Sequence, residues 1–502
     1  NNNYCFIKIG GEDGKRITKQ STQLPDAEIT VSVYDMLQRV EDDKVNLLGA
    51  FSGAEGTGKD WYGDIFNSGA REKDMSGRFD FSGFDPQSPM SVDLVFAGRS
   101  SSPQTLTLKT GSKTISKNIT QVSVLNAESL YARRVILSET FAIPDNNPSV
   151  VLSYQASAGD AEGWLDYLQI AHSRKLLLDK SQLAFRSRAT IGAGVAAFKP
   201  ENLSGQIIWD VTDPSNPKEI VPVNSSIIFS PEGQLHEFIS FGGVSSAFEP
   251  IALGKLANQN LHGMETEAMI IVYHPQFKEE ALKLAAHRSQ VSGFKVLAAS
   301  TDQVYNEFSS GRVDPGAIRD MARLLYERNP AFRYLLLFGD GSYDYKGLVR
   351  DLPAENFVPV YETDESLDPI DGFPSDDFYG LLGPEEGENL KGGLDIYVGR
   401  LPAKSAEEAM ILVNKIIHYE TDPGSFGDWR VRSGYVADDE DSNTHLRDMD
   451  EIARSDEQRH PIQNQQKVYA DAYTQVSTPG ENRFPDANKS INDNIFKGQL
   501  SL

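Results

Sequence analysis

The sequence predicts β-rich N-terminal domains of the sandwich or barrel type, followed by an α/β domain with a mostly parallel sheet. Before residue 262, runs of β-forming residues are separated by Gly, Asn, Asp, Ser and Pro. After it, short apolar runs alternate with segments of helical spacing. Because 502 residues are too many for one core, we expect β-rich domains at 1–120 and 121–262 and an α/β domain at 263–502.

The first half is expected to form antiparallel sheets. Its strand-forming runs recur at a spacing typical of sandwiches and barrels, and none carries a chemical motif. The segment 161–172 is compatible with a strand that places Trp164 and Tyr167 on opposite faces, or with a short helix. The predicted strands are 27–36, 90–99, 104–111, 148–157 and 205–213.

The second half alternates strands with helices, which predicts parallel strands joined by helical crossovers. Gly293 is placed to end one helix, because glycine readily adopts the left-handed conformation. Asp314 is placed to cap the next helix, with Pro315 in its first turn. The predicted helices are 277–293, 314–329, 405–420 and 444–456, and the predicted strands are 268–274, 294–300, 334–340, 395–402, 432–441 and 466–471.

The formal net charge is −24, and such a field repels phosphate backbones, so we expect no nucleic-acid binding. No apolar run approaches the ~20 residues that a membrane-spanning helix needs. The sequence begins at Asn1 without a basic-then-apolar leader, so we expect any signal peptide to have been removed. Cys5 is the single cysteine, and no His is near it in the sequence. We expect it to be structural or exposed rather than a nucleophile.

The run Tyr334–Phe338 meets Gly339-Asp340-Gly341, as a buried strand does when it enters a ligand-binding loop. A phosphate cradle would need a Gly-rich backbone that leads directly into a helix, and usually a Lys. Here no helix is predicted after the loop. We therefore expect a turn at the carboxyl end of the strand, where Asp340 and Asp344 can point into a cleft.

Two further acidic clusters are compatible with calcium, which takes oxygen ligands. Residues 363–377 form either a calcium loop or a solvated loop in which Asp side chains cap turns. Residues 438–443 have a partial Asp-x-Asp-x-Asn pattern, but Thr444 stands where a calcium loop would have glycine. Helix capping by Asp441, Ser442 or Thr444 is the alternative at this second cluster.

Residues 265–502 resemble the gingipain-type cysteine peptidases, and among them most closely the sortases of the bacterial type IX secretion system. The motifs that carry the resemblance occur in the same order and at similar spacing. They are "IIVYHPQFKEEALKLAAHRSQVSGFKV", "YNEFSSGRVDPGAIRDMARLLY", "YLLLFGDGSYDYKG", "SDDFYGLL", "DIYVGRLPAKSAEEA", "KIIHYE" and "DAYTQVSTPGENRFPDANKSIND".

This resemblance implies a caspase-like α/β fold with a catalytic Cys–His pair. In the family the His stands in a His-Gly loop after a buried strand, and the Cys follows the next strand. Residues 499–502 resemble the beginning of the strand that leads to that His, and none of the eight histidines lies in the expected loop. We therefore expect the pair to lie beyond residue 502, the α/β domain to be C-terminally incomplete here, and residues 1–502 alone to be inactive.

The resemblance also implies a carboxylate that orients the His. The acidic run after the strand "RSGYVA" stands where gingipains carry this group, so Asp439 and Glu440 are the candidates. Asp438 is expected to come too early and to point into the sheet, and Asp441 to serve as a helix cap. The next candidates are Asp340 and Asp377.

Near the same run, His445 falls close to where arginine-specific members of the family place an acid for their specificity pocket. This difference argues against strict arginine specificity.

The activity that the resemblance implies is removal of the C-terminal signal domain from secreted cargo, with transfer of the cargo to lipopolysaccharide. The implied location is the extracellular face of the outer membrane. The implied partners are cargo signal domains, lipopolysaccharide as acceptor, and an outer-membrane barrel of the PorV-like kind. No cofactor is required. The alternatives are a peptidase-like scaffold without catalysis and a calcium-dependent surface-binding protein.

Overall fold

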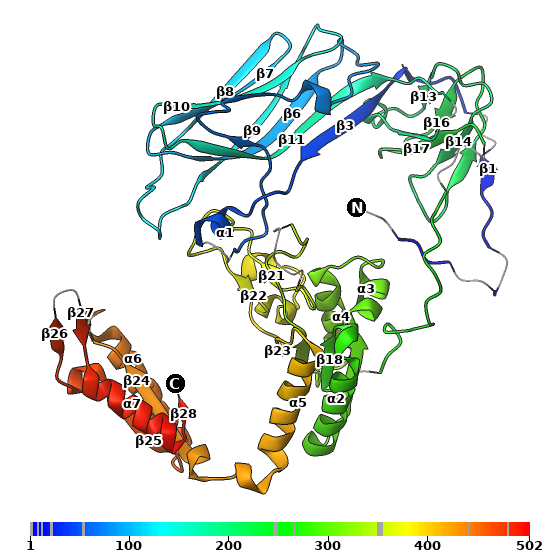
Figure 1. Ribbon diagram of the computed structural model, residues 1–502. Coiled ribbons are helices and arrows are strands. Elements are labelled where there is room, and N and C mark those ends of the chain that lie inside the picture. The colour runs from blue at the N-terminus through cyan, green and yellow to red at the C-terminus, as the bar shows by residue number, and fades with distance from the viewer. Residues whose placement is uncertain are drawn as a thin grey trace. The chain divides into compact units, whose positions relative to one another are not determined.

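The computed structural model describes residues 4–7, 10–11, 14–20, 24–52, 56–179, 181–243, 249–265, 267–348, 355–439, 441–478 and 481–501. As predicted, β-rich sheets come first along the chain and a parallel α/β region follows (Figure 1). The chain divides into two compact units, Asn1–Lys404 and Ser405–Leu502, and each is described by itself. Within the described ranges, no helix is long and apolar enough to cross a membrane.

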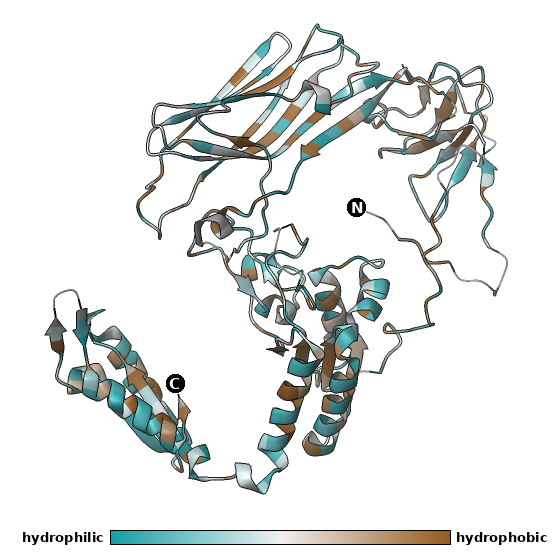
Figure 2. Cartoon of the chain, in the orientation of Figure 1, coloured by the Kyte–Doolittle hydropathy of each residue, from teal (hydrophilic) through white to brown (hydrophobic). Residues whose placement is uncertain are grey.

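Two antiparallel sheets form the first β module. Buried apolar residues of both sheets, such as Phe96, Leu108, Leu152 and Leu168, share one core, which makes the module a sandwich. Figure 2 shows apolar and polar residues alternating along its long strands, as expected when one face of a sheet is buried. The first sheet contains, in order, β3 (Val33–Glu41), β11 (Glu162–Lys175), β6 (Met90–Arg99) and β9 (Arg133–Phe141), and β4 (Ile65–Phe66) pairs with β11. The second sheet contains, in order, β5 (Glu72–Asp74), β10 (Val150–Ala156), β7 (Gln104–Thr110) and β8 (Lys113–Ile119).

A second β module is built from short strands on either side of the first in sequence. Its core is aromatic, with Phe198 in contact with Phe185, Phe229 and Phe238. The strands are β1 (Thr18–Gln20), β15 (Lys218–Ile220), β14 (Ile207–Asp210), β17 (Phe238–Phe241) and β12 (Leu183–Phe185) in one sheet, and β16 (Ile227–Phe229), β13 (Ala196–Phe198) and β2 (Ile29–Val31) in the other.

The sheets do not divide at residue 120, where the sequence suggested a boundary between two β-rich domains. β6 pairs with β9, and β7 pairs with β10, so both sheets of the sandwich combine strands from the two predicted ranges. The turn-rich stretch 120–132 is a loop that joins β8 to β9. The segment 161–172 is a strand, because it lies between β3 and β6 in the middle of a sheet.

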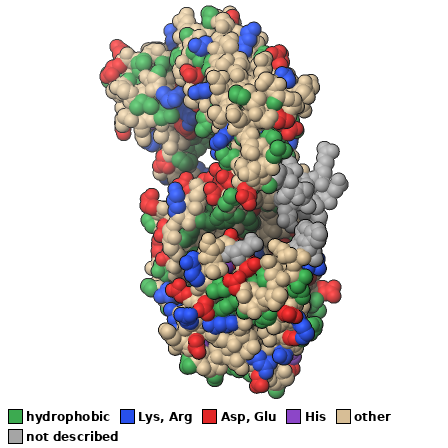
Figure 3. Space-filling view, turned by 90° about the vertical axis from the view of Figure 1, so that its left-hand side faces the viewer, with side chains coloured by type: hydrophobic (Ala, Val, Ile, Leu, Met, Phe, Trp, Pro, Cys, Tyr) green, Lys and Arg blue, Asp and Glu red, His purple; other side chains and the backbone are tan. Residues whose placement is uncertain are grey.

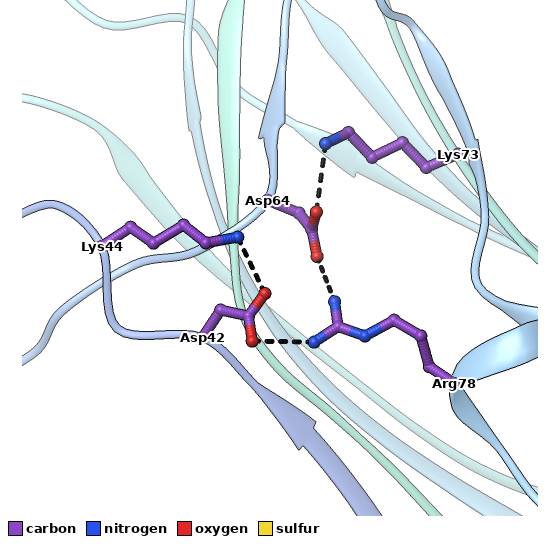
Figure 4. Close-up of polar contacts among 5 residues, drawn as sticks. All are labelled: Asp42, Lys44, Asp64, Lys73 and Arg78. Atoms are coloured by element: carbon purple, nitrogen blue, oxygen red, sulfur yellow. Dashed lines mark hydrogen bonds and ion pairs between the residues drawn. The ribbon is translucent and has the colours of Figure 1, made fainter.

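An ion-pair network joins β5 with the segments that follow β3 and precede β4 (Figure 4). Arg78 bridges Asp42 and Asp64 at 2.8 and 2.6 Å, Lys44 pairs with Asp42, and Lys73 pairs with Asp64. The hydrogen bond from Lys44, followed by the charge of Arg78, lowers the pKa of Asp42. Isolated exposed pairs stabilise little, whereas a network of this kind fixes the geometry of the loops it joins.

The first unit also contains a four-stranded parallel sheet. β18 (Met269–Tyr273) and β20 (Tyr334–Phe338) are central, β19 (Val296–Ser300) and β23 (Tyr397–Leu401) are at the edges, and the order is β19-β18-β20-β23. Apolar side chains of the sheet pack against helical residues such as Ile318 and Met321. The helices of this region are α2 (Lys278–Ser292), α3 (Thr301–Phe308) and α4 (Pro315–Arg328). A hairpin of β21 (Tyr361–Glu362) and β22 (Pro374–Ser375) follows β20. Earlier in the chain, a short helix α1 (Leu47–Ser52) lies in the loop between β3 and β4.

The helix signals in the sequence are confirmed here. Gly293 follows α2 with a φ of 74°, the left-handed conformation expected after a helix. The Asp314 side chain accepts a hydrogen bond from the backbone of Gly316, and Pro315 is the first residue of α4.

The second unit contains a three-stranded parallel sheet in the order β25-β24-β28. Its central strand, β24 (Arg432–Ala437), is buried along most of its length. The remaining elements are α5 (Ala406–Thr421), α6 (Thr444–Arg459), β25 (Asn464–Tyr469), β26 (Val476–Thr478), β27 (Glu481–Arg483), α7 (Pro485–Lys497) and β28 (Leu500–Ser501).

Candidate functional site

The loop after β20 is held by backbone hydrogen bonds rather than by a helix. The Asp340 N–H donates to the carbonyl of Ala403, and the Asp340 carbonyl accepts from the N–H groups of Phe357 and Val358. Gly339 has a φ of 142°, and a Cβ there would lie 2.8 Å from the Phe357 Cβ, so the position requires glycine. The loop is therefore a turn at the carboxyl end of the strand, as predicted, and not a phosphate cradle.

Arg400, from the parallel strand β23, fixes the surroundings of this loop. Its five N–H groups donate to the carbonyls of Gly339, Val358 and Pro359 and to both carboxylate oxygens of Asp376, at 2.6–3.1 Å. Burial is the largest single influence on the pKa of Arg400 and by itself would lower it, but the hydrogen bonds to Asp376 together with the charges of Asp376 and Asp340 raise that pKa. Every donor of the guanidinium is used within the protein, so Arg400 positions the loop and has no N–H left for a ligand.

Glu362, at the end of β21, is 5% exposed. Its Oε2 accepts hydrogen bonds from the Gly58 N–H at 3.0 Å and the Thr57 hydroxyl at 3.1 Å, both from the loop that precedes β4. Its Oε1 is buried and has no hydrogen-bond partner within the described residues. Burial raises the pKa of Glu362, and the two hydrogen bonds offset only part of that effect.

These residues surround an open cavity of about 440 Å³ at the carboxyl end of the sheet. Asp340, Glu362 and Asp376 contribute three carboxyl groups to its lining, and Arg400 contributes the one cationic side chain of the lining. Asp340 also pairs with Lys404 at 3.4 Å. Sequence reasoning placed Asp340 at this edge, but it missed Glu362 and Arg400. An Arg within the apolar strand "DIYVGRL" is the signal that could have found the latter.

A second candidate site lies at the carboxyl end of β24. Asp439 is two residues after the end of β24, and its Oδ2 accepts a hydrogen bond from the Gln475 side chain at 3.3 Å. Glu440 lies outside the described residues. β24 pairs in parallel with β28, Gly434 facing Ser501, so both strands point toward the same edge of the sheet.

Asp438 and Asp441 lie differently from their predicted positions. The Asp438 side chain is exposed rather than directed into the sheet, and its Oδ1 is 2.9 Å from the Nδ1 of His445. Asp441 does not cap the helix: Asn443 is the N-cap of α6, with no side-chain hydrogen bond, and Asp441 lies 3.7 Å from His445. The reason is the backbone, since residues 441–443 all have positive φ, which turns these side chains away from the helix start.

The three side chains Asp438, Asp441 and His445 are the single group in the described part of the chain whose carboxylate or imidazole atoms converge enough for a metal ion. All three are exposed, and ion pairs account for their positions. The hydrogen bond with Asp438 raises the pKa of His445. An imidazole is a poor ligand for calcium, which takes oxygen atoms.

In the loop 363–377, acidic side chains cap turns, which was one of the two interpretations of this cluster. The Glu365 carboxylate accepts from the backbone of Leu367, and the Asp368 carboxylate accepts from that of Ile370. Asp364 pairs with Lys59. Cys5 is exposed and free.

Acidic side chains are spread over the whole face that Figure 3 shows, with basic side chains between them. This distribution agrees with the net charge of −24.

Comparison with known proteins finds a family match in the second half of the chain. Residues 264–502 match the family Peptidase family C25. No curated protein matches the chain. Among solved structures, dimeric latent PorU from Porphyromonas gingivalis is similar over 82% of this chain and 40% of that one, with a TM-score of 0.68 and 23% identity. The Arg specific cysteine proteinase gingipain R (RGPB) is similar over 42% of this chain and 43% of that one, with a TM-score of 0.32 and 18% identity.

The chain therefore spans less than half the length of either of these structures. At 23% identity, the similarity to PorU shows a shared fold, which includes the β-rich sheets and the parallel α/β region.

Proposed function

We propose that this chain, whose residues 264–502 match peptidase family C25, is part of a cell-surface sortase of the type IX secretion system. The proposal rests mainly on how much of this chain is similar in structure to PorU. The similarity to the PorU structure covers 82% of the chain, which is more than the part formed by residues 264–502. The shared fold therefore includes β-rich sheets that precede the region matched by the family. The motifs of residues 265–502 also resemble those of type IX sortases.

The proposed chemistry is acyl transfer by a Cys thiolate. The sulfur attacks the scissile carbonyl carbon, a C–S bond forms, and the C–N bond breaks as the signal domain leaves with a proton from the imidazolium. The amine of a lipopolysaccharide acceptor then attacks the thioester. Its C–N bond forms as the C–S bond breaks, and its proton passes to the imidazole. Water can replace the amine, which gives hydrolysis.

The geometry of the second unit supports Asp439 as the group that orients the catalytic His. Gly434 of β24 faces Ser501 of β28, and Ala437 ends β24 three residues later. A strand that continued β28 in this register would reach the level of Ala437 three residues after Ser501. We place the catalytic His in the loop after such a strand, where the Asp439 carboxylate can accept an imidazole N–H and fix the tautomer.

Glu440 remains a second candidate for the same role. Asp438 is a weaker one, because its carboxylate is already paired with His445.

The proposed substrate is the C-terminal signal domain of secreted cargo, and the proposed site of action is the extracellular face of the outer membrane. An outer-membrane barrel would hold the protein there. These statements rest on the resemblance to sortases.

Deletion of the gene in the bacterium that produces the protein tests this function. Cargo should then keep its signal domain, and the intact gene should restore maturation. A gene with the proposed His and Cys changed to Ala should fail to restore it. If that variant restores maturation fully, the protein is a scaffold without catalysis. Normal maturation in the deletion strain would contradict a role in cargo processing.

A further inference from the structure

The cavity at the end of β20 has the composition of a binding site for a cationic group. Its lining includes the carboxyl groups of Asp340, Glu362 and Asp376, and Arg400 is the one cationic side chain in that lining. Because all five N–H groups of Arg400 donate to the protein, the hydrogen-bonding capacity that remains in the lining is mostly that of acceptors.

The buried carboxyl group of Glu362 provides a second, independent observation. The residue is 5% exposed, its Oε2 has two hydrogen-bond donors, and its Oε1 is buried without a partner within the described residues. A buried carboxylate oxygen without a donor is costly, because the desolvation of the group is not compensated. A cationic ligand next to this carboxyl group would offset part of this cost, and Glu362 is one of the residues that line the cavity.

The arrangement of the carboxylates favours an organic cation over a metal ion. In the described residues, Asp340, Glu362 and Asp376 do not form a group of three carboxylates whose oxygens converge as metal ligands do. The volume of about 440 Å³ is also much larger than an ion needs, and it lies in the range of sites for small organic ligands.

The rest of the lining fits the aliphatic stem of such a cation. Val360, Pro374 and the ring of Tyr343 contribute apolar surface. Tyr343 is fixed in place because it stacks on Trp61, with 6.0 Å between ring centroids and 4° between planes. An aromatic ring next to carboxylates is a favourable surface for an ammonium or guanidinium group.

We propose that this cavity binds the basic side chain of a peptide, an ammonium or guanidinium group on an aliphatic stem, with Glu362 as its principal anion and Asp340 as the second. Asp376 contributes less, because its carboxylate is bound on both oxygens by Arg400. Asp340 is also paired with Lys404, at 3.4 Å, and a cationic ligand would share its carboxylate with that side chain. The cavity is built by the first compact unit alone. The inference therefore does not rest on the proposed sortase activity.

Isothermal titration of the full chain with three small probes tests the proposal. Nα-acetyl-lysine amide and Nα-acetyl-arginine amide carry the two cations, and Nα-acetyl-norleucine amide is the neutral control with a similar stem. At least one basic probe should bind ten times more tightly than norleucine amide. Equal binding of the three probes, or no binding, would overturn the proposal.

Matched variants locate the site. Glu362→Gln keeps an oxygen that can accept from Gly58 and Thr57, and it should weaken binding of the basic probe at least fivefold. Asp364→Asn, which removes a carboxylate from the same hairpin loop but outside the cavity, should change binding less than twofold.

Asp340→Asn gives the same test if Glu362→Gln does not fold. Binding that neither cavity variant weakens would overturn the assignment of the site. Binding of calcium but of neither basic probe, lost in Glu362→Gln, would replace the proposal with a metal site.

Discussion

His445 and Asp438 form an exposed imidazole–carboxylate pair at the end of β24, with 2.9 Å between Nδ1 and Oδ1. The hydrogen bond with Asp438 is the largest cause that raises the pKa of His445, and the charges of Asp441 and Asp448 add to it. Because the folded-state pKa lies above the unfolded value of about 6.5, the pair stabilises the fold below that pH. This stabilisation is lost as the pH rises through the folded-state pKa.

Asp438→Asn should therefore lower the pKa of His445, measured by NMR titration of its ring protons. Asp448→Asn should lower it much less, because Asp448 acts only through its charge. If both variants lower the pKa equally, the net charge of the cluster, and not the hydrogen bond, sets the titration.

Asp439 is the residue whose loss should affect catalysis most within this chain. In the complete protein, Asp439→Ala should slow cargo maturation by about a hundredfold while the protein remains folded, because the imidazole loses its orienting carboxylate. Immunoblots of cargo over time measure the rate. Glu457→Ala, on the exposed side of α6 in the same unit, is the control and should mature cargo at the parent rate.

Glu440→Ala is measured in the same assay, since Glu440 is the second candidate. If both Asp439→Ala and Glu440→Ala process cargo at the parent rate, the orienting carboxylate lies elsewhere. Asp340 and Asp377 would then be examined next.

Single-residue signals in the sequence were reliable where they act locally. Gly293 and Asp314 act within one turn of their helices, and both lie as predicted. The roles of Asp438 and Asp441 could not be predicted in the same way. They depend on three successive residues with positive φ, none of them glycine, and no local preference favours that backbone.

At the scale of elements, the segment Gly56–Gly58 connects the sandwich with the β21–β22 hairpin. Gly58 has a φ of 84°, and a Cβ there would lie 2.7 Å from the Cα of Ser366. Gly58→Ala should cost about 2–4 kcal/mol, from the left-handed backbone together with the clash. Hydrogen exchange followed by mass spectrometry should show faster exchange of the hairpin amides.

Gly205→Ala is the matched control for that substitution. Gly205 has a similar φ of 79°, but a Cβ there would meet no atom within 4 Å, so only the backbone cost of about 1–2 kcal/mol applies. Equal hairpin exchange in the two variants would show that the close contact with Ser366 does not hold the segment in place.

Calcium binding by the acidic loops stays a prediction. If 363–377 or 438–443 holds calcium, the melting temperature should be higher in millimolar calcium than in chelator, because the ion binds the folded state preferentially. Asp438→Asn should remove the shift if the second loop is responsible. A melting temperature that is the same in calcium and chelator would count against a tight site in either loop.

Strand positions were predictable because periodicity and turn residues are local signals. β6 begins and ends at the predicted residues, and β10 falls inside its predicted range. The partners of these strands were not predictable. The pairing of β1 with β15 joins residues about 200 positions apart, and nothing in either short strand specifies the other.

The cavity of the first unit also depends on pairing across long distances. Gly58 and Glu362 meet although 304 residues separate them, so Glu362 could not be recognised as a buried acid from its own neighbourhood. Asp340 was predictable, because the end of a buried parallel strand marks the ligand edge of a sheet.

For the whole molecule, our proposal is that this chain carries the orienting carboxylate and the β modules of a sortase-type cysteine peptidase. Intact-mass spectrometry of purified cargo, incubated with the complete protein, tests this claim most directly. We expect loss of the signal domain, addition of the mass of a supplied amine, and no change when residues 1–502 replace the complete protein. Cargo that stays intact with the folded, complete protein, or cleavage by residues 1–502 alone, would contradict it.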